Sequence, residues 1–241
     1  MINFPLLRLQ SGHYQIEELD LKTALKLSVI PFGQNEYAIS QFIDACVKTE
    51  QGDKVNPRAL TVEDRMMLVA HYLASTSDTP DFAIGRANFS DYLVGEDAKG
   101  RVQEATVGEV AQDNWLVKPL TGEHSEAIER TMGAVEGIND KVHWLVGRMA
   151  CQLHRDGETR DYDDIDTWLI ERITVMTSFP ESDFASLFFA FEETRKKLQH
   201  LFIIGNDGAG LVAKPREEDS AFSAARFPVD SCITGFVKSM A

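Results

Sequence analysis

Apolar residues recur every three or four positions along several stretches of this chain, which is the spacing of one face of an α-helix. In the first half, the pattern predicts three helices, at residues 19–28, 35–47 and 61–73. Thr61 is expected to cap the third helix, because its hydroxyl can accept the backbone N–H of Asp64. We therefore predict a helical N-terminal segment over residues 1–77.

The period changes between residues 78 and 120. Four glycines separate short apolar pieces in this part of the chain: Gly85, Gly95, Gly100 and Gly108. The stretch Arg101–Val107 partly alternates between polar and apolar positions, as a strand with one buried face does. We predict a small β-rich module of two to four strands here.

The helical period returns at residue 121. Four helices are predicted, starting near Thr121, after Asn139, after Asp163 and at Pro180. Helices joined by short connections pack as antiparallel neighbours, so residues 121–204 are predicted to form a four-helix, bundle-like segment. The fold class expected is mainly α with a small β-rich insertion (α+β).

The last segment, residues 205–241, begins with a glycine-rich turn and is then rich in Ser, Ala, Pro and charge. This composition fits two interpretations: a mobile tail, or an extended arm that becomes ordered only against a partner. Under the second interpretation, the candidate partner-binding residues are the apolar ones: Phe222, Phe227, Ile233, Phe236 and Val237.

A short sequence pattern occurs in both halves of the chain, and we call it the Leu-Thr-x-Glu echo. Leu60-Thr61-Val62-Glu63 and Leu120-Thr121-Gly122-Glu123 share Leu-Thr-x-Glu ahead of a predicted helix. A duplicated unit would explain the echo, and so would two independent helix caps. We favour independent caps, because any helix N-terminus favours these residue types.

Charge and cysteine usage narrow the function classes. Lys and Arg total 24 and Asp and Glu total 38, so the formal net charge is −14, which disfavours generic binding to nucleic acid or anionic membranes. The widely spaced Cys46, Cys151 and Cys232 form no CxxC pair, which favours reduced, intracellular thiols. The N-terminus does not resemble a secretory signal, and no apolar run approaches the ~20 residues that span a bilayer.

No sequence motif points to a specific catalytic or cofactor site. Gly205–Gly210 follows an apolar run but lacks the residue order of a phosphate-binding loop. His143 and His154 lie about 16 Å apart on one predicted helix, too far to share an ion, so we predict no metal site despite the nearby Cys151. For an enzyme, His143 with Asp140 would be the first candidate pair.

The order of these segments resembles the small tail and baseplate assembly proteins of tailed bacteriophages, including the hub-associated family of T-even-type phages. The likeness rests on the helix opening at residues 60–68, the β-rich middle, the helix around residues 168–173, and a Phe-rich last helix closing at residues 203–205. It covers residues 55–210 and concerns the order and general composition of the segments.

The resemblance implies a virion structural or assembly protein of the tail or baseplate, which acts by protein–protein contacts without catalysis, cofactor or metal. Its expected partners are other tail or baseplate proteins, or further copies of itself, with no nucleic acid, membrane or small-molecule substrate. Its expected location is the host cytoplasm during assembly, and the virion tail if it is structural. The alternatives are a tail assembly chaperone not retained in the particle, an uncharacterised soluble enzyme, and a regulatory adaptor.

Overall fold

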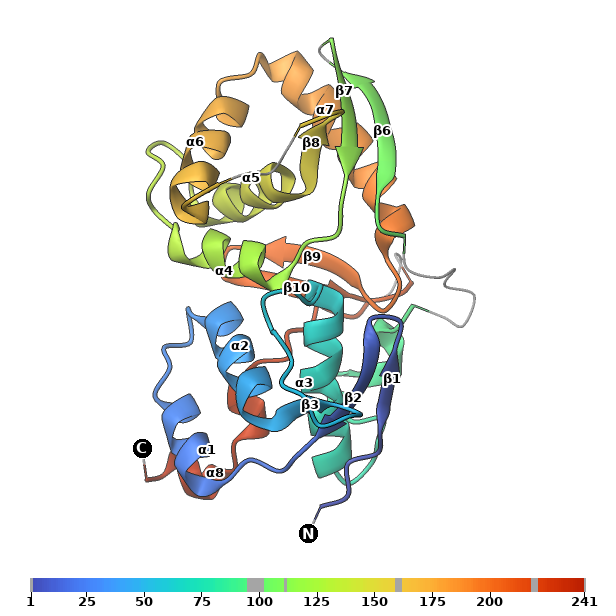
Figure 1. Cartoon of the computed structure of the whole chain (residues 1–241), viewed down its shortest axis with the longest axis vertical. Coiled ribbons are helices and arrows are strands. Elements are labelled where there is room, and N and C mark those ends of the chain that lie inside the picture. Colours follow the sequence, from blue (N-terminus) through green and yellow to red (C-terminus); the bar gives the residue numbers. More distant parts are fainter. Residues whose placement is uncertain (1, 95–101, 111, 159–161, 218–220, 241) are drawn as a thin grey trace.

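The computed structural model describes residues 2–94, 102–110, 112–158, 162–217 and 221–240. These residues form helices and small antiparallel sheets (Figure 1). The α+β class predicted from the sequence is therefore confirmed. The C-terminal four-helix bundle is not confirmed, because strands interrupt the helices of that region.

The N-terminal part begins with a hairpin. Its elements are β1 (Leu7–Leu9), β2 (Gly12–Ile16), α1 (Leu21–Ser28), α2 (Asn35–Cys46), β3 (Val47–Thr49) and α3 (Val62–Thr76). Strand β3 returns from the two helices and pairs antiparallel with β2, so that Ile16 lies opposite Val47. Both side chains are buried and join the helices to the sheet in one core.

The middle of the chain supplies a second hairpin. After the short strands β4 (Ala83–Ile84) and β5 (Ala87–Asn88) and the 3₁₀ turn η1 (Phe89–Tyr92), the chain forms β6 (Ala105–Val110) and β7 (Asp113–Val117). These strands belong to two separate sheets, β4–β5 and β6–β7–β8, the second of which includes a strand, β8 (Leu153–Arg155), from beyond residue 120. Arg101, at the start of the predicted alternating stretch, lies outside the described residues.

The second hairpin repeats the plan of the first. It is followed by α4 (Gly122–Arg130), α5 (Asp140–Gln152), β8 (Leu153–Arg155) and α6 (Ile165–Thr177). Strand β8 pairs antiparallel with β7, and Val117 lies opposite Leu153, as Ile16 lies opposite Val47. We call residues 7–76 unit 1 and residues 105–177 unit 2.

The correspondence between the units extends to their connections. In each unit, four residues join the second strand to the first helix, and the third strand begins directly after the second helix. The first N–H beyond the second strand donates to the last carbonyl of the second helix: Glu17 to Cys46 at 2.8 Å, and Lys118 to Gln152 at 3.0 Å. The chain therefore contains a structural duplication.

The Leu-Thr-x-Glu echo does not mark equivalent positions of this duplication. It precedes the third helix in unit 1 and the first helix in unit 2. The two segments instead lie against each other: Thr61 and Thr121 form an isolated antiparallel bridge, with the Val62 N–H donating to Leu120 and the Gly122 N–H to Leu60. The echo thus belongs to two caps that meet where the units join.

Local cap chemistry predicted some helix ends correctly. The Thr61 hydroxyl accepts the Asp64 N–H at 3.2 Å, and Asn139 accepts the Val142 N–H at 3.0 Å. The predicted continuation of two helices through Val47 and Leu153 is wrong, because both residues begin strands. Their apolar side chains fit either period, and the pairing with β2 and β7 decides between them.

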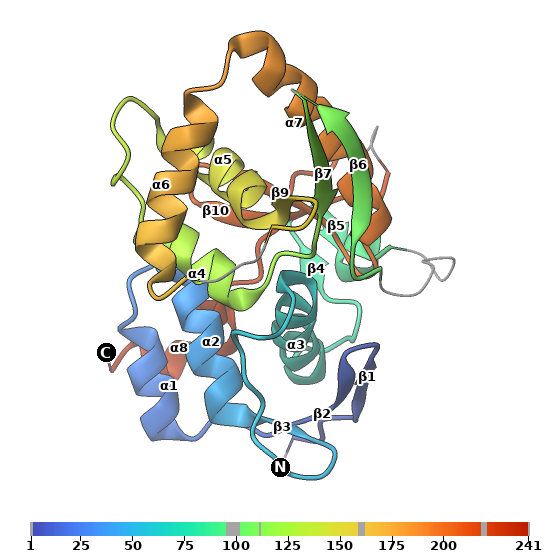
Figure 2. The same ribbon diagram turned by 45° about the horizontal axis from the view of Figure 1, so that its top comes forward.

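The C-terminal part closes the molecule. Its elements are α7 (Glu181–Arg195), the 3₁₀ turn η2 (Lys196–Leu198), β9 (Ile203–Asp207), β10 (Gly210–Lys214), the 3₁₀ turn η3 (Val229–Cys232) and α8 (Gly235–Lys238). Strands β9 and β10 form an antiparallel hairpin beneath α5 (Figure 1). The chain then returns to unit 1, where η3 contacts α3 and α8 contacts α1 (Figure 2).

This return corrects the prediction of an extended C-terminal tail over residues 205–241. The segment begins with a hairpin, and the side chains of Phe227, Ile233 and Val237 are buried in the chain's own core. The η3–α8 segment around Ile233 and Val237 packs on helices of unit 1, whereas Phe227 packs on Phe82, Phe89 and Phe202, which lie outside unit 1.

Candidate functional site

A cluster of charged side chains lies where α5, α7 and the β9–β10 hairpin meet. Helix α5 contributes Arg148, α7 contributes Glu192 and Arg195, and β10 ends at Lys214. Glu192 accepts hydrogen bonds from both arginines: from Arg148 Nη2 at 3.1 Å, and from Arg195 Nε and Nη2 at 2.8 Å each. We call these four residues the Glu192 cluster.

Arg148 is the most constrained member of the cluster. Its side chain is 2% exposed, and its Nε atom is buried with no hydrogen-bond partner among the described residues. Burial, followed by the like charge of Arg195, lowers the pKa of Arg148 to about 9. A single carboxylate therefore does not fully compensate this buried guanidinium.

Glu192 stays ionised in this setting. Burial alone would raise its pKa, but the hydrogen bond from Arg195 and the charges of Arg195, Arg148 and Lys214 lower it overall. The carboxylate is thus the negative centre that the surrounding cations share.

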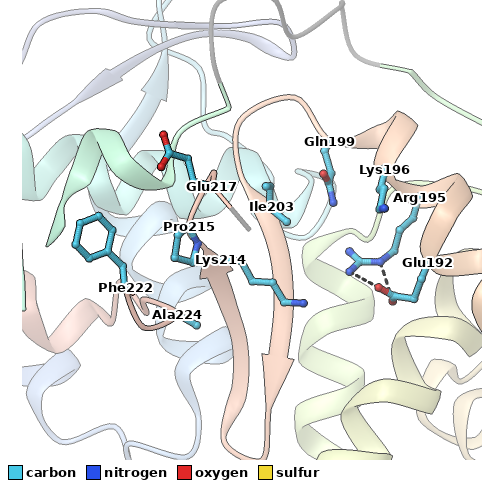
Figure 3. A pocket seen from close by; sticks show the side chains of 10 residues that line it. All are labelled: Glu192, Arg195, Lys196, Gln199, Ile203, Lys214, Pro215, Glu217, Phe222 and Ala224. Atoms are coloured by element: carbon cyan, nitrogen blue, oxygen red, sulfur yellow. Dashed lines mark hydrogen bonds and ion pairs between the residues drawn. The ribbon is translucent and has the colours of Figure 1, made fainter. Parts of the chain in front are cut away.

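Lys214 reaches the cluster because of a glycine on the neighbouring strand. The lysine side chain crosses β9 at Gly205, where a Cβ atom would lie 2.6 Å from the lysine Cε. Figure 3 shows the Lys214 amine directed toward the Arg195–Glu192 pair. Any larger residue at position 205 would displace the lysine stem.

Cavities surround the Glu192 cluster. One of about 520 Å³ opens on the side of Lys196, Pro215 and Phe222 (Figure 3). Another of about 440 Å³ lies over the start of α5 and is lined by Asn139, Phe188 and the whole cluster. A small cavity of about 30 Å³, the space of a single water molecule, also touches both arginines.

A second charged network lies between the two units. Arg65 is fully buried and donates to the Ser40 hydroxyl at 3.0 Å and to the Glu36 carbonyl at 2.6 Å. The carboxylates of Glu36 and Glu126 lie 3.6 and 3.7 Å from its guanidinium. Ser40 in turn donates to Glu126, so the network joins unit 1 to unit 2, although the Arg65 Nε atom is buried without a partner among the described residues.

A third network fixes the approach to β9. One oxygen of Glu63 accepts the backbone N–H groups of His200, Leu201 and Phe202 at 2.7 to 3.2 Å. Burial opposes protonation of His200, but its hydrogen bonds with Asp64 and Glu63 prevail and raise its pKa to about 9. This histidine is a charged structural anchor, because it is held between two acidic side chains of α3.

The histidines considered for metal binding or catalysis, His143 and His154, are both buried. His143 is buried, its Nε2 contacts the Ile128 carbonyl oxygen at 2.9 Å, and burial lowers its pKa. His154 lies on β8 instead of on α5 and interacts with Glu104. Among the described residues, no three His, Cys, Asp or Glu side chains are grouped closely enough to hold a metal ion.

The five residues predicted to bind a partner are not brought together. Phe227, Ile233 and Val237 are buried, whereas the exposed fractions of Phe222 and Phe236 are 37% and 70%. Exposed apolar residues that sequence reasoning missed lie on α1 and just after it: Leu21, Val29 and Phe32. The Glu192 cluster was missed too, because its members come from three elements far apart in the sequence.

Comparison of this chain with models of protein families, with curated proteins and with solved structures finds no match. Among the described helices, none combines the length and apolar character needed to cross a membrane.

Proposed function

We propose that this chain is a tail or baseplate protein of a tailed bacteriophage, structural or assembly-related, that acts by protein–protein contact without catalysis. The order of its segments supports this proposal, as does the exposed apolar surface on α1 and α8. Leu21 on α1 is 53% exposed, Val29 and Phe32 just after α1 are 67% and 68% exposed, and Phe236 is 70% exposed on α8, which contacts α1. We call these four residues the α1/α8 surface.

This surface is the observation that carries the proposal. Single exposed apolar side chains are common on soluble proteins, but aromatic side chains are enriched at interfaces, and two of them, Phe32 and Phe236, are exposed here, one just after α1 and one on α8. Buried aromatic anchors supply much of the binding energy of such contacts. The surface also keeps Phe236 as the partner-binding residue expected from the sequence, and adds Phe32.

The first test is quantitative mass spectrometry of particles purified from the source of this chain. A fixed copy number in the particles supports a structural role. If the chain is needed for particle formation but absent from the particles, it is an assembly chaperone. If the source produces no particles, the phage proposal is overturned.

The contact surface is tested separately by Phe236→Asp. We expect this variant to keep the wild-type melting temperature and to lose incorporation into particles or co-purification with its partner. Phe189→Asp is the matched control, because Phe189 is equally exposed at 69% but lies on α7. Equal loss in both variants, or in neither, would contradict a contact through α1 and α8.

A further inference from the structure

The Glu192 cluster has more positive charge than its internal partners balance. Arg148, Arg195 and Lys214 surround one carboxylate in a chain whose net charge is −14. A buried charge is costly unless it is paired and hydrogen-bonded. Arg148 retains a buried Nε–H without a partner among the described residues, as Arg65 does between the units, so what distinguishes the Glu192 cluster is its excess of positive charge beside a cavity.

The cavity of about 440 Å³ lies directly against this excess of positive charge. Lys141 and the first turn of α5, capped by Asn139, form part of its wall. Backbone N–H groups at a helix start favour a negative group nearby. Leu145 and Phe188 supply an apolar wall.

We propose that this cavity binds a small ligand with one oxyanion group, either a carboxylate or a phosphate, and an apolar body. The oxyanion would lie against Arg148, Arg195 and Lys214, since guanidinium groups match the oxygens of both anions. The apolar body would pack on Phe188 and Leu145. The volume falls within the range of about 300–1,000 Å³ usual for small-molecule sites.

The competing explanation is that the cluster is purely structural. The small cavity of about 30 Å³ has room for one water molecule, which would complete the hydrogen bonding of Arg148 without any anion. The two explanations differ in measurable respects. A binding site gives a response that saturates with anion concentration and depends on the cations of the cluster, whereas the general stabilisation by excluded phosphate does neither.

The test is the thermal unfolding of the full chain with inorganic phosphate, with benzoate, or with sodium chloride at matched ionic strength. At ten times the dissociation constant, we expect phosphate or benzoate to raise the melting temperature by about 3 to 6 °C beyond the chloride value. A saturating response to phosphate alone assigns a phosphate ligand, and a saturating response to benzoate alone assigns an apolar carboxylate. No saturating response beyond chloride to either probe overturns the proposal.

Two substitutions locate the response. Lys214→Ala removes an exposed cation, and Gly205→Ala displaces the lysine stem. Both should reduce the anion-dependent shift at least threefold. Lys196→Ala is the matched control, because Lys196 pairs with Glu193 and lines the other cavity. An unchanged shift in Lys214→Ala, or equal reductions in Lys214→Ala and Lys196→Ala, would contradict the assignment.

Glu192→Gln separates binding from structure most sharply. It removes the shared carboxylate, so we expect a lower melting temperature without anion and a larger anion-dependent rise than in wild type. A purely structural cluster predicts the first effect without the second. The outcome does not depend on the phage proposal, because it concerns a different surface from α1 and α8.

Discussion

Units 1 and 2 have the same order of strands and helices, but their third helices differ in burial. Helix α3 buries ten of its 15 residues, including Glu63, Asp64 and Arg65, whereas α6 buries three of 13: Leu169, Ile173 and Met176. The difference follows from position, because α3 lies where the units meet and α6 lies at one side of unit 2 (Figure 2). The same topology thus tolerates a charged helix face when partners come from outside the unit: Glu126 of unit 2 for Arg65, and residues 200–202 of the C-terminal part for Glu63 and Asp64.

The second helices differ in how their N-termini are capped. Asn139 caps α5 from within its own unit. The N-cap of α2, Gln34, makes no side-chain cap bond among the described residues. Instead Glu129, at the end of α4 in unit 2, accepts the N–H groups of Glu36 and Tyr37 at 2.8 and 3.0 Å. The N-terminus of α2 in unit 1 is therefore capped by a side chain of unit 2.

The largest effect is expected from Arg65→Ala. The fourth residue after the N-cap is Arg65 in α3 and Trp168 in α6, so this position marks the difference between the units. Removing the guanidinium leaves Glu36 and Glu126 buried without their cation, which costs about 3–5 kcal/mol. Urea unfolding measures the loss.

Arg58→Ala is the control for this substitution. Arg58 also pairs with Glu126, at 3.0 Å, but its side chain is 56% exposed. Loss of such a pair should cost less than about 1 kcal/mol. Similar losses for both variants would show that the buried network is not what joins the units.

Gly122→Ala is expected to cost about 2 kcal/mol. Gly122 is the first residue of α4, and a Cβ there would overlap the Arg65 guanidinium and lie 2.5 Å from the Pro57 carbonyl oxygen. Overpacking of this kind distorts its surroundings.

The first residue of α1 in unit 1 is Leu21, which is 53% exposed, so Leu21→Ala should change the unfolding free energy by less than about 0.5 kcal/mol. Thermal unfolding of both variants tests the contrast, and equal effects would contradict it.

These comparisons show which features the sequence alone can predict. The caps at Thr61 and Asn139 are local, since each depends on a side chain and an N–H three residues later, and both were predicted. The break between α5 and β8 is not local, because Leu153 continues the helical period and only its pairing with Val117 makes it a strand. The sequence suggested a duplication only through the Leu-Thr-x-Glu echo. The two copies of that pattern do not occupy equivalent positions in units 1 and 2, so the pattern did not reveal the duplication.

The Glu192 cluster likewise could not be predicted from local sequence alone. Arg148 follows Leu145 by three residues and so falls on the predicted apolar face of α5, a signal that was present in the sequence. Its partners are set by how α7 and the β9–β10 hairpin pack on α5, which no spacing within one helix reveals. The same holds for Phe227 and Phe236. Composition marks both as apolar, but Phe227 is buried against Phe82, Phe89 and Phe202, whereas Phe236 is exposed on α8.

The cap that Glu129 of unit 2 supplies to α2 predicts a pH-dependent stability, which the local cap of Asn139 on α5 does not. Burial raises the pKa of Glu129 from its usual 4.5 to about 7, although the bonds from the α2 backbone oppose this shift. Between these values the folded state binds more protons than the unfolded state, so the contribution of Glu129 to stability falls as the pH rises from about 4.5 to about 7. Glu129→Gln should remove a change of about 2 kcal/mol over this window, a figure reduced to allow for partial exposure.

Urea unfolding of wild type and Glu129→Gln at several pH values measures this difference. Taking the difference between the two proteins cancels the other carboxylates, such as Glu192, whose lowered pKa acts in the opposite sense. If wild type instead gained stability relative to the variant as the pH rose, the α2 N-terminus would outweigh burial, and the pKa of Glu129 would be depressed.

Apart from the control variants, the smallest effect is expected from Asn139→Ala, which removes the local cap of α5. Losing a side-chain acceptor at an N-cap costs about 1 kcal/mol, and the asparagine does not titrate, so the loss should be the same at pH 5 and pH 8. Asn139 also lines the cavity of about 440 Å³, but its side-chain oxygen is occupied by the Val142 N–H. A loss that varies with pH as strongly as that of Glu129→Gln would mean that the two caps are coupled, and that the contrast between the local cap of α5 and the cap that unit 2 supplies to α2 is wrong.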